Sequence, residues 1–97
     1  MRNPKLLELR ASVIGRVQGV GFRAKTKELA MQMHLGGFVR NLKDASVEIH
    51  AQGTKEQLTQ FLEQLKQRFS DHIQELKIEW IEPSEVYAHF TISRMDG

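Results

Sequence analysis

The spacing of hydrophobic residues divides this 97-residue chain into predicted strands and helices. Apolar and polar residues alternate, as is typical of half-buried strands, in the segments 7–17, 47–52, 76–80 and 88–92, and residues 38–42 are interpreted as a further strand. Between these segments, residues 22–33 and 58–69 carry apolar side chains three or four positions apart, which predicts two amphipathic helices. The predicted order is therefore β-α-β-β-α-β, with the last segment as a short C-terminal strand.

Local signals mark where several of these elements begin and end. Gly36 and Gly37 follow the first helix, and glycine commonly ends helices. Thr54 and Gln57 have the spacing of a capping box, which predicts the start of the second helix. The short segment 43–46 joins two strands and predicts a hairpin.

Two amphipathic helices and one alternating sheet predict a two-layer α+β sandwich. The simplest topology for this order is ferredoxin-like, with an antiparallel sheet and both helices on one of its faces. A chain of this length has room for one domain, so we expect residues 1–97 to form a single domain with a modest core. The aliphatic stripes, Ile78 among them, are assigned to that core.

Composition excludes several classes of protein. The chain has no cysteine, which excludes disulfide and thiolate chemistry and is compatible with a reducing compartment. It shows neither a signal-peptide segment nor an apolar run long enough to span a membrane, so we expect a cytoplasmic protein without a membrane partner. The net charge of +2 does not suggest wrapping of nucleic acid.

The positive charge is concentrated in one part of the chain. Residues 16–43 carry six Lys or Arg and a single acid, Glu28. Such a segment favours a small anionic ligand over a polyanion. Within it, Lys25 and Lys27 are interpreted as charges on a solvated helix face.

A glycine-rich loop lies between the first strand and the first helix, and its glycines permit a tight turn with converging N–H groups. Together with the free N–H groups of the helix start, the loop can cradle an anion, over which the planar guanidinium of Arg23 can close. An arginine at this end of a helix opposes the helix dipole, and a bound anion would remove the conflict. The segment comprises Gly15, Arg16, Val17, Gln18, Gly19, Val20, Gly21, Phe22 and Arg23.

This loop differs from the two common nucleotide-binding motifs. A Walker sequence requires Lys and then Ser or Thr after its last glycine, where this chain has Phe22 and Arg23. Residues 19–24 match G-x-G-x-x-G/A, and Asp44 lies about 20 residues further on, but the dinucleotide fold needs several parallel strands and a hairpin follows here. A strand–helix turn without a ligand remains the alternative.

Asn41 is a second candidate, because asparagine is a poor strand residue and stands here at the end of a predicted strand. It either caps the hairpin or positions a water molecule. The four histidines have no metal-ligand spacing, and no nucleophile or base accompanies the loop. Such a site suits attack by water on a bond with a good leaving group, such as a carboxyl–phosphate anhydride, and not on a phosphate monoester.

The same residues resemble the signatures of a known family. Residues 13–23 are similar to the acylphosphatase pattern G-x-V-Q-G-V-x-F-R, and residues 37–41 with Val47 and Gly53 are similar to its second signature. The resemblance covers essentially the whole chain. It implies a ferredoxin-like hydrolase without metal or cofactor, which converts an acyl phosphate to carboxylate and inorganic phosphate by attack of water at phosphorus.

The resemblance also implies roles for individual residues. Arg23 corresponds to the family's substrate-binding arginine and Asn41 to its water-orienting asparagine. Inorganic phosphate or sulfate is expected to compete with the substrate, and the protein is expected to be a monomer. One departure is Ala45, where the family usually has glycine, so the hairpin turn is expected to differ or to be strained. The implied phosphate-binding residues are Arg16, Val17, Gln18, Gly19, Val20, Gly21, Phe22 and Arg23.

Two other functions remain open at this point. An acylphosphatase-like domain can bind an anion without turnover inside a larger maturation protein, although the short chain argues against this. An RNA-recognition domain shares the order of elements, and residues 37–39 partly match its motif. However, Gly36 and Asn41 stand where that domain needs stacking aromatic residues, so no nucleic-acid partner is expected.

Overall fold

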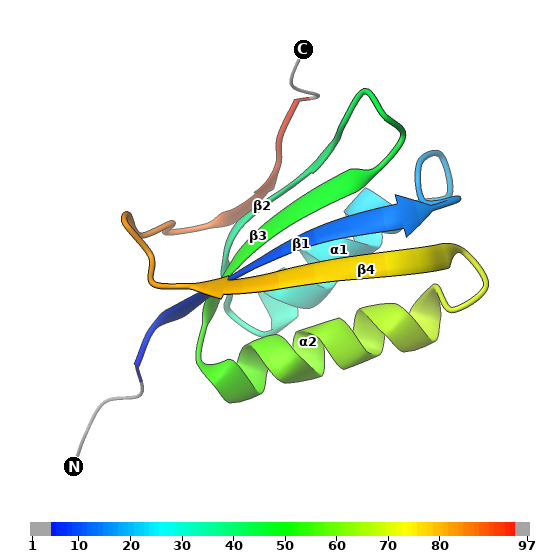
Figure 1. The fold of residues 1–97 in the computed structure, drawn as a ribbon. Coiled ribbons are helices and arrows are strands. Elements are labelled where there is room, and N and C mark those ends of the chain that lie inside the picture. Colours follow the sequence, from blue (N-terminus) through cyan, green and yellow to red (C-terminus); the bar gives the residue numbers. More distant parts are fainter. Residues whose placement is uncertain (1–4, 95–97) are drawn as a thin grey trace.

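The computed structural model describes residues 5–94 and shows a sheet with both helices on one face (Figure 1). This is the predicted two-layer, ferredoxin-like arrangement, in the predicted order. The elements are β1 (Leu7–Gly15), α1 (Phe22–Gln32), β2 (Gly36–Asn41), β3 (Val47–Gly53), α2 (Lys55–Arg68), β4 (Ile73–Ile81) and β5 (Phe90–Ile92).

The strands lie side by side in the order β4-β1-β3-β2-β5. The pairs β1–β3, β1–β4 and β2–β3 are antiparallel, as predicted. The C-terminal strand differs, because β5 runs parallel to β2, with Gly37 opposite Phe90 and Val39 opposite Ile92. The connection 82–89 returns the chain to the start of β2, so β5 adds in the same direction as β2 and makes the complete sheet mixed.

The core lies between the sheet and the helices. The alternation along β1 buries Leu9, Ala11 and Val13, and α2 begins at the predicted capping box. In that box, the Gln57 N–H donates to Thr54 Oγ1 at 3.1 Å, and the Thr54 N–H donates to Gln57 Oε1 at 2.9 Å. From α2 the core receives Leu58, Phe61, Leu62 and Leu65. The local signals therefore determine both the start of α2 and its buried face.

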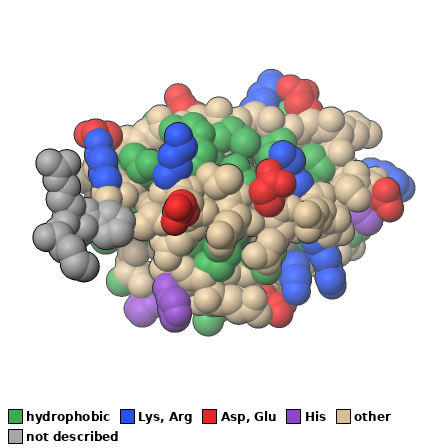
Figure 2. All heavy atoms as spheres, turned by 90° about the horizontal axis from the view of Figure 1, so that it is seen from below, with side chains coloured by type: hydrophobic (Ala, Val, Ile, Leu, Met, Phe, Trp, Pro, Cys, Tyr) green, Lys and Arg blue, Asp and Glu red, His purple; other side chains and the backbone are tan. Residues whose placement is uncertain are grey.

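The strand β4 departs from its predicted environment. Ile78 was assigned to the core, yet 42% of its surface is exposed, as is 41% of that of Trp80. The reason is that β4 is an edge strand, so these side chains have a neighbouring strand on one side only. Viewed from the side of α2, the surface shows hydrophobic side chains exposed among charged ones (Figure 2).

Neither described helix has the length and apolar character needed to cross a membrane.

Candidate active site

The loop between β1 and α1 is anchored at both ends. The Arg16 N–H donates to the carbonyl of His72 at 2.9 Å, which ties the start of the loop to the segment after α2. Val17 and Phe22 are each 1% exposed. The ring of Phe22 packs edge-on against Phe69, with 4.8 Å between the ring centroids. These contacts fix the ends of the loop, while its central residues 19–21 are exposed.

The central part of the loop depends on two glycines. Gly19 has φ of 79° and Gly21 has φ of 80°, in the left-handed region that other residues rarely adopt. Each follows a residue with negative φ, Gln18 and Val20 respectively. Alternation of this kind turns successive N–H groups toward one side and forms a concavity for an anion. The predicted conformational need for glycine is therefore confirmed at these two positions.

The start of α1 adds further unpaired donors. Gly21 precedes the helix without a side-chain cap, and the first turn contains no acidic residue. The first hydrogen bond of the helix runs from the Lys25 N–H to the Gly21 carbonyl at 3.0 Å. The N–H groups of Phe22, Arg23 and Ala24 therefore have no acceptor within the helix. With the positive end of the helix dipole, they favour an anion at this place.

Arg23 lines a pocket of about 180 Å³ beside the loop. Its side chain is half-buried, and no carboxylate within residues 5–94 pairs with it. Two other cations of the basic segment do have carboxylate partners: Lys25 lies 3.5 Å from Glu28, and Arg40 pairs with Glu48. The guanidinium of Arg23 is thus available to a ligand. The residues lining the pocket are Val17, Gly19, Gly21, Phe22, Arg23, Ala24 and Ile92.

The side chain of Gln18 connects the loop to the β2–β3 hairpin. Its Nε2 donates to the carbonyls of Leu42 at 3.0 Å and Ser46 at 2.9 Å. The sequence did not predict this side-chain role, because the two acceptors lie 24 and 28 residues away. The bonds hold the loop against the hairpin, directly beside the end of β2 that carries Asn41.

Asn41 is the last residue of β2 and lies opposite Val47. Its Oδ1 is buried and has no hydrogen-bond partner within the described chain. The hairpin is closed by other groups: the Ser46 N–H donates to Asp44 Oδ1 at 3.0 Å, and hydrogen bonds from Ser46 hold the pKa of Asp44 below its usual value. The structure therefore gives no support to a hairpin-capping role for Asn41. Asn41 does not line the pocket of Arg23.

The turn residue Ala45 adopts φ of 73°, the left-handed conformation for which glycine is favoured. Its N–H donates to the Leu42 carbonyl at 3.2 Å, so the turn is closed despite the methyl group. The strain expected at this departure from the family pattern is therefore confirmed: it consists in the left-handed backbone conformation of Ala45.

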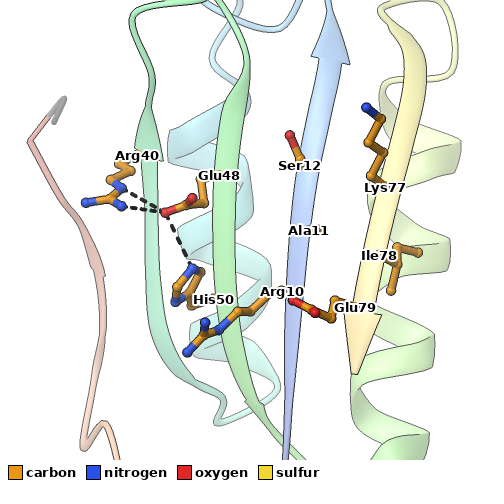
Figure 3. A pocket seen from close by; sticks show the side chains of 9 residues that line it. All are labelled: Arg10, Ala11, Ser12, Arg40, Glu48, His50, Lys77, Ile78 and Glu79. Carbon is orange, nitrogen blue, oxygen red and sulfur yellow. Dashed lines mark hydrogen bonds and ion pairs between the residues drawn. The ribbon is translucent and has the colours of Figure 1, made fainter. Parts of the chain in front are cut away.

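A larger pocket lies elsewhere, on the face of the sheet that the helices leave open (Figure 3). Its volume is about 520 Å³. Charges here compensate one another: Arg40 Nη2 lies 2.6 Å and His50 Nε2 3.4 Å from Glu48 Oε1. Burial lowers the pKa of His50. Within residues 5–94 no group of three His, Cys, Asp or Glu could hold a metal ion. This face is a paired charge network and not an unpaired anion site.

The fold and the loop define a small α+β protein in which backbone N–H groups converge between a strand and a helix. The family model of acylphosphatases matches residues 9–92. An acylphosphatase of Thermus thermophilus is 48% identical over 64 residues, which span 66% of this chain and 69% of that protein. An acylphosphatase of Ligilactobacillus salivarius is 38% identical over 94 residues, spanning 96% of this chain and 99% of that one. The chain belongs to the acylphosphatase family, whose members are hydrolases of acyl phosphates.

The solved structures agree with this assignment. The crystal structure of acylphosphatase from Bacillus subtilis has a TM-score of 0.81 and 33% sequence identity to this chain. The match covers 90% of this chain and 98% of the other.

Proposed function

We propose that this member of the acylphosphatase family hydrolyses the carboxyl–phosphate anhydride of a small acyl phosphate at the loop of residues 16–22. The observation that carries the proposal is the pocket beside this loop. There Arg23, which lacks a carboxylate partner in the described chain, lies next to two left-handed glycines and the unpaired start of α1. All of these groups donate hydrogen bonds, so they suit an anion with several acceptor oxygens.

The loop and Arg23 would bind the phosphoryl group of the substrate. Backbone N–H groups of residues 17–22 would donate to its oxygens, and the guanidinium would donate two further parallel bonds. In phosphoryl transfer the charge spreads over these oxygens in the transition state. Donors that are already fixed by Val17, Phe22 and Gln18 would stabilise this charge without reorganisation.

Asn41 would position the attacking water. Its Oδ1 lacks a partner in residues 5–94, and its carboxamide has both a donor and an acceptor that would orient the water oxygen for attack. The water oxygen would form a bond to phosphorus while the bond from phosphorus to the acyl oxygen breaks. The carboxylate leaves with the electron pair of that bond, and inorganic phosphate remains in the loop.

The proton of the water would pass to the phosphoryl group itself. None of the residues that line the pocket of Arg23 is a histidine or a carboxylate, so no side chain there can act as a base. This restricts the enzyme to substrates with a good leaving group. A carboxylate leaves readily, whereas the alkoxide of a phosphate monoester does not.

One chain would carry all of these groups, so a monomer would be sufficient for catalysis. Inorganic phosphate and sulfate would compete with the substrate, because the donors recognise a tetrahedral anion. We also place the enzyme in the cytoplasm, since a chain without cysteine needs no oxidising compartment.

The direct test is hydrolysis of benzoyl phosphate by the purified protein, with phenyl phosphate as the monoester comparison. Activity on benzoyl phosphate alone, unchanged by a metal chelator, is expected. Arg23→Ala should also weaken the binding of inorganic phosphate by about tenfold or more, since charged hydrogen bonds contribute about 1.5–3 kcal/mol each. Lys27→Ala, one turn along α1, is the matched control and should leave phosphate affinity unchanged. Full activity or normal phosphate affinity in Arg23→Ala would contradict the proposal.

A further inference from the structure

Between residues 20–28 and 68–72 lies a further pocket of about 450 Å³, the α1–α2 pocket. It borders the loop after β1 and shares Gly21 and Ala24 with the pocket of Arg23. The two pockets extend in different directions from there. The α1–α2 pocket reaches the end of α2, whereas the pocket of Arg23 reaches Ile92 of β5. A molecule bound at the loop can therefore extend into both.

The loop lies between the α1–α2 pocket and the residue assigned to the attacking water. At this end of the sheet the strands follow one another from the start of β4, through the end of β1 and the start of β3, to the end of β2 (Figure 1). His72 directly precedes β4, and Asn41 ends β2. In phosphoryl transfer the attacking and leaving oxygens lie roughly in line. Water held by Asn41 therefore directs the leaving acyl group toward the α1–α2 pocket.

One wall of the α1–α2 pocket suits the carbon skeleton of an acyl group. The side chain of Val20 is 41% exposed and thus available to a ligand. The ring of Phe69 packs edge-on against that of His72, with 6.0 Å between the ring centroids. The hydrogen bond from the Arg16 N–H to the His72 carbonyl fixes this wall relative to the loop. Small-molecule sites typically combine such an apolar lining with a few polar groups.

The charged side chains that line the α1–α2 pocket leave one positive charge uncompensated. Lys25 and Glu28 lie 3.5 Å apart and compensate each other. Arg68 forms no hydrogen bond or ion pair with another residue of the described chain 5–94. Lys66, in the same last turn of α2, instead pairs with Glu63 at 3.6 Å and does not line the pocket. The guanidinium of Arg68 is therefore available to an anionic group of a ligand.

We propose that the α1–α2 pocket binds the acyl group of the substrate and that Arg68 selects acyl groups with a second carboxylate. The inference rests on the proposed hydrolysis of acyl phosphates at the loop and adds the chemical class of the acyl group. The planar fork of Arg68 would donate two parallel hydrogen bonds to this carboxylate. Arg68 would touch none of the reacting atoms, so it would determine specificity and not the chemical step.

Hydrolysis of two matched substrates at constant ionic strength tests the proposal. Benzoyl phosphate and 4-carboxybenzoyl phosphate differ by one carboxylate, which is too far from the anhydride to attack it within the molecule. The wild-type protein should have the higher kcat/KM for 4-carboxybenzoyl phosphate. Arg68→Ala should lower this value by about three- to tenfold, because a charged but exposed contact is lost. It should leave kcat/KM for benzoyl phosphate nearly unchanged. Arg68→Lys retains the charge and should keep part of the preference.

Lys66→Ala is the matched control, because it removes the same charge from the same turn of α2 outside the pocket. It should leave the preference between the two substrates unchanged. Equal losses in Lys66→Ala and Arg68→Ala would indicate general electrostatic attraction and overturn the proposal. Inorganic phosphate should inhibit Arg68→Ala and the wild type equally, and weaker inhibition of the variant would place Arg68 at the phosphoryl group instead.

The outcome for the acyl group can be separated from the outcome for the enzymatic activity. A folded Arg68→Ala variant with the wild-type preference would contradict this inference alone, and its melting temperature shows whether it is folded. A wild-type protein that hydrolyses neither substrate would contradict the proposed function and this inference with it.

Discussion

The turn at Ala45 predicts a substitution that should stabilise the protein by removing one methyl group. With φ of 73°, Ala45 occupies a conformation that costs an L-residue about 1–2 kcal/mol. Glycine adopts it without this cost but has more conformational freedom to lose on folding, about 0.4–1 kcal/mol. Ala45 is exposed, so the methyl group contributes little packing. Ala45→Gly should therefore raise the free energy of unfolding by about 0.5–1 kcal/mol.

Thermal unfolding is the appropriate measurement. For a domain of this size the expected gain corresponds to a rise in Tm of about 2–8 °C. Ala24→Gly is the matched control, because Ala24 is also exposed but lies in α1, where φ is negative. The same loss of a methyl group there should lower the free energy of unfolding by about 0.5–1 kcal/mol.

The two variants should therefore move Tm in opposite directions. A fall in Tm for Ala45→Gly, or a change of the same sign in both variants, would refute the argument from backbone conformation. Hydrolysis should not change in Ala45→Gly, because the bond from the residue 45 N–H to the Leu42 carbonyl belongs to the main chain and remains.

Three further predictions concern single residues. Asn41→Ala should lower kcat by about 10²–10³ with little change in phosphate affinity, as expected for a group that positions water; a folded variant with normal kcat would remove Asn41 from the mechanism. Arg23→Lys should bind phosphate about tenfold more weakly, because a point charge replaces the planar fork; equal affinity would exclude a bidentate contact. Burial raises the pKa of Glu8, but hydrogen bonds from Gln52 and Arg10 lower it more, so the net shift is downward. Stability from this carboxylate is therefore present above its unfolded pKa of about 4.5 and lost as the pH falls through the lowered folded value. Glu8→Gln should lower Tm at pH 7, and this loss should shrink as the pH is lowered stepwise below 4.5; a loss that stays constant down to the acid limit of folding would contradict this linkage.

The sequence was sufficient for those features that depend on neighbouring residues. The periods of two and of three to four follow from strand and helix geometry, and they predicted the order of the elements. The capping box at Thr54 and the need for glycine at positions 19 and 21 are equally local, since each depends on the backbone within a few residues. The loop motif around Arg23 could be recognised from the sequence for the same reason, because its residues are contiguous.

The features that join distant segments could not be predicted from the sequence and became visible only in the folded chain. Gln18 reaches carbonyls 24 and 28 residues away, and Asn41 keeps a buried oxygen without a partner in the described chain because other groups close the hairpin. Alternation along β4 predicted a strand but not its exposed apolar side chains. A period of two records that successive side chains point to opposite faces, whereas the packing of Ile78 depends on how many strands lie beside it. The parallel pairing of β5 with β2 is likewise set by the route of the chain between them, which no local pattern encodes.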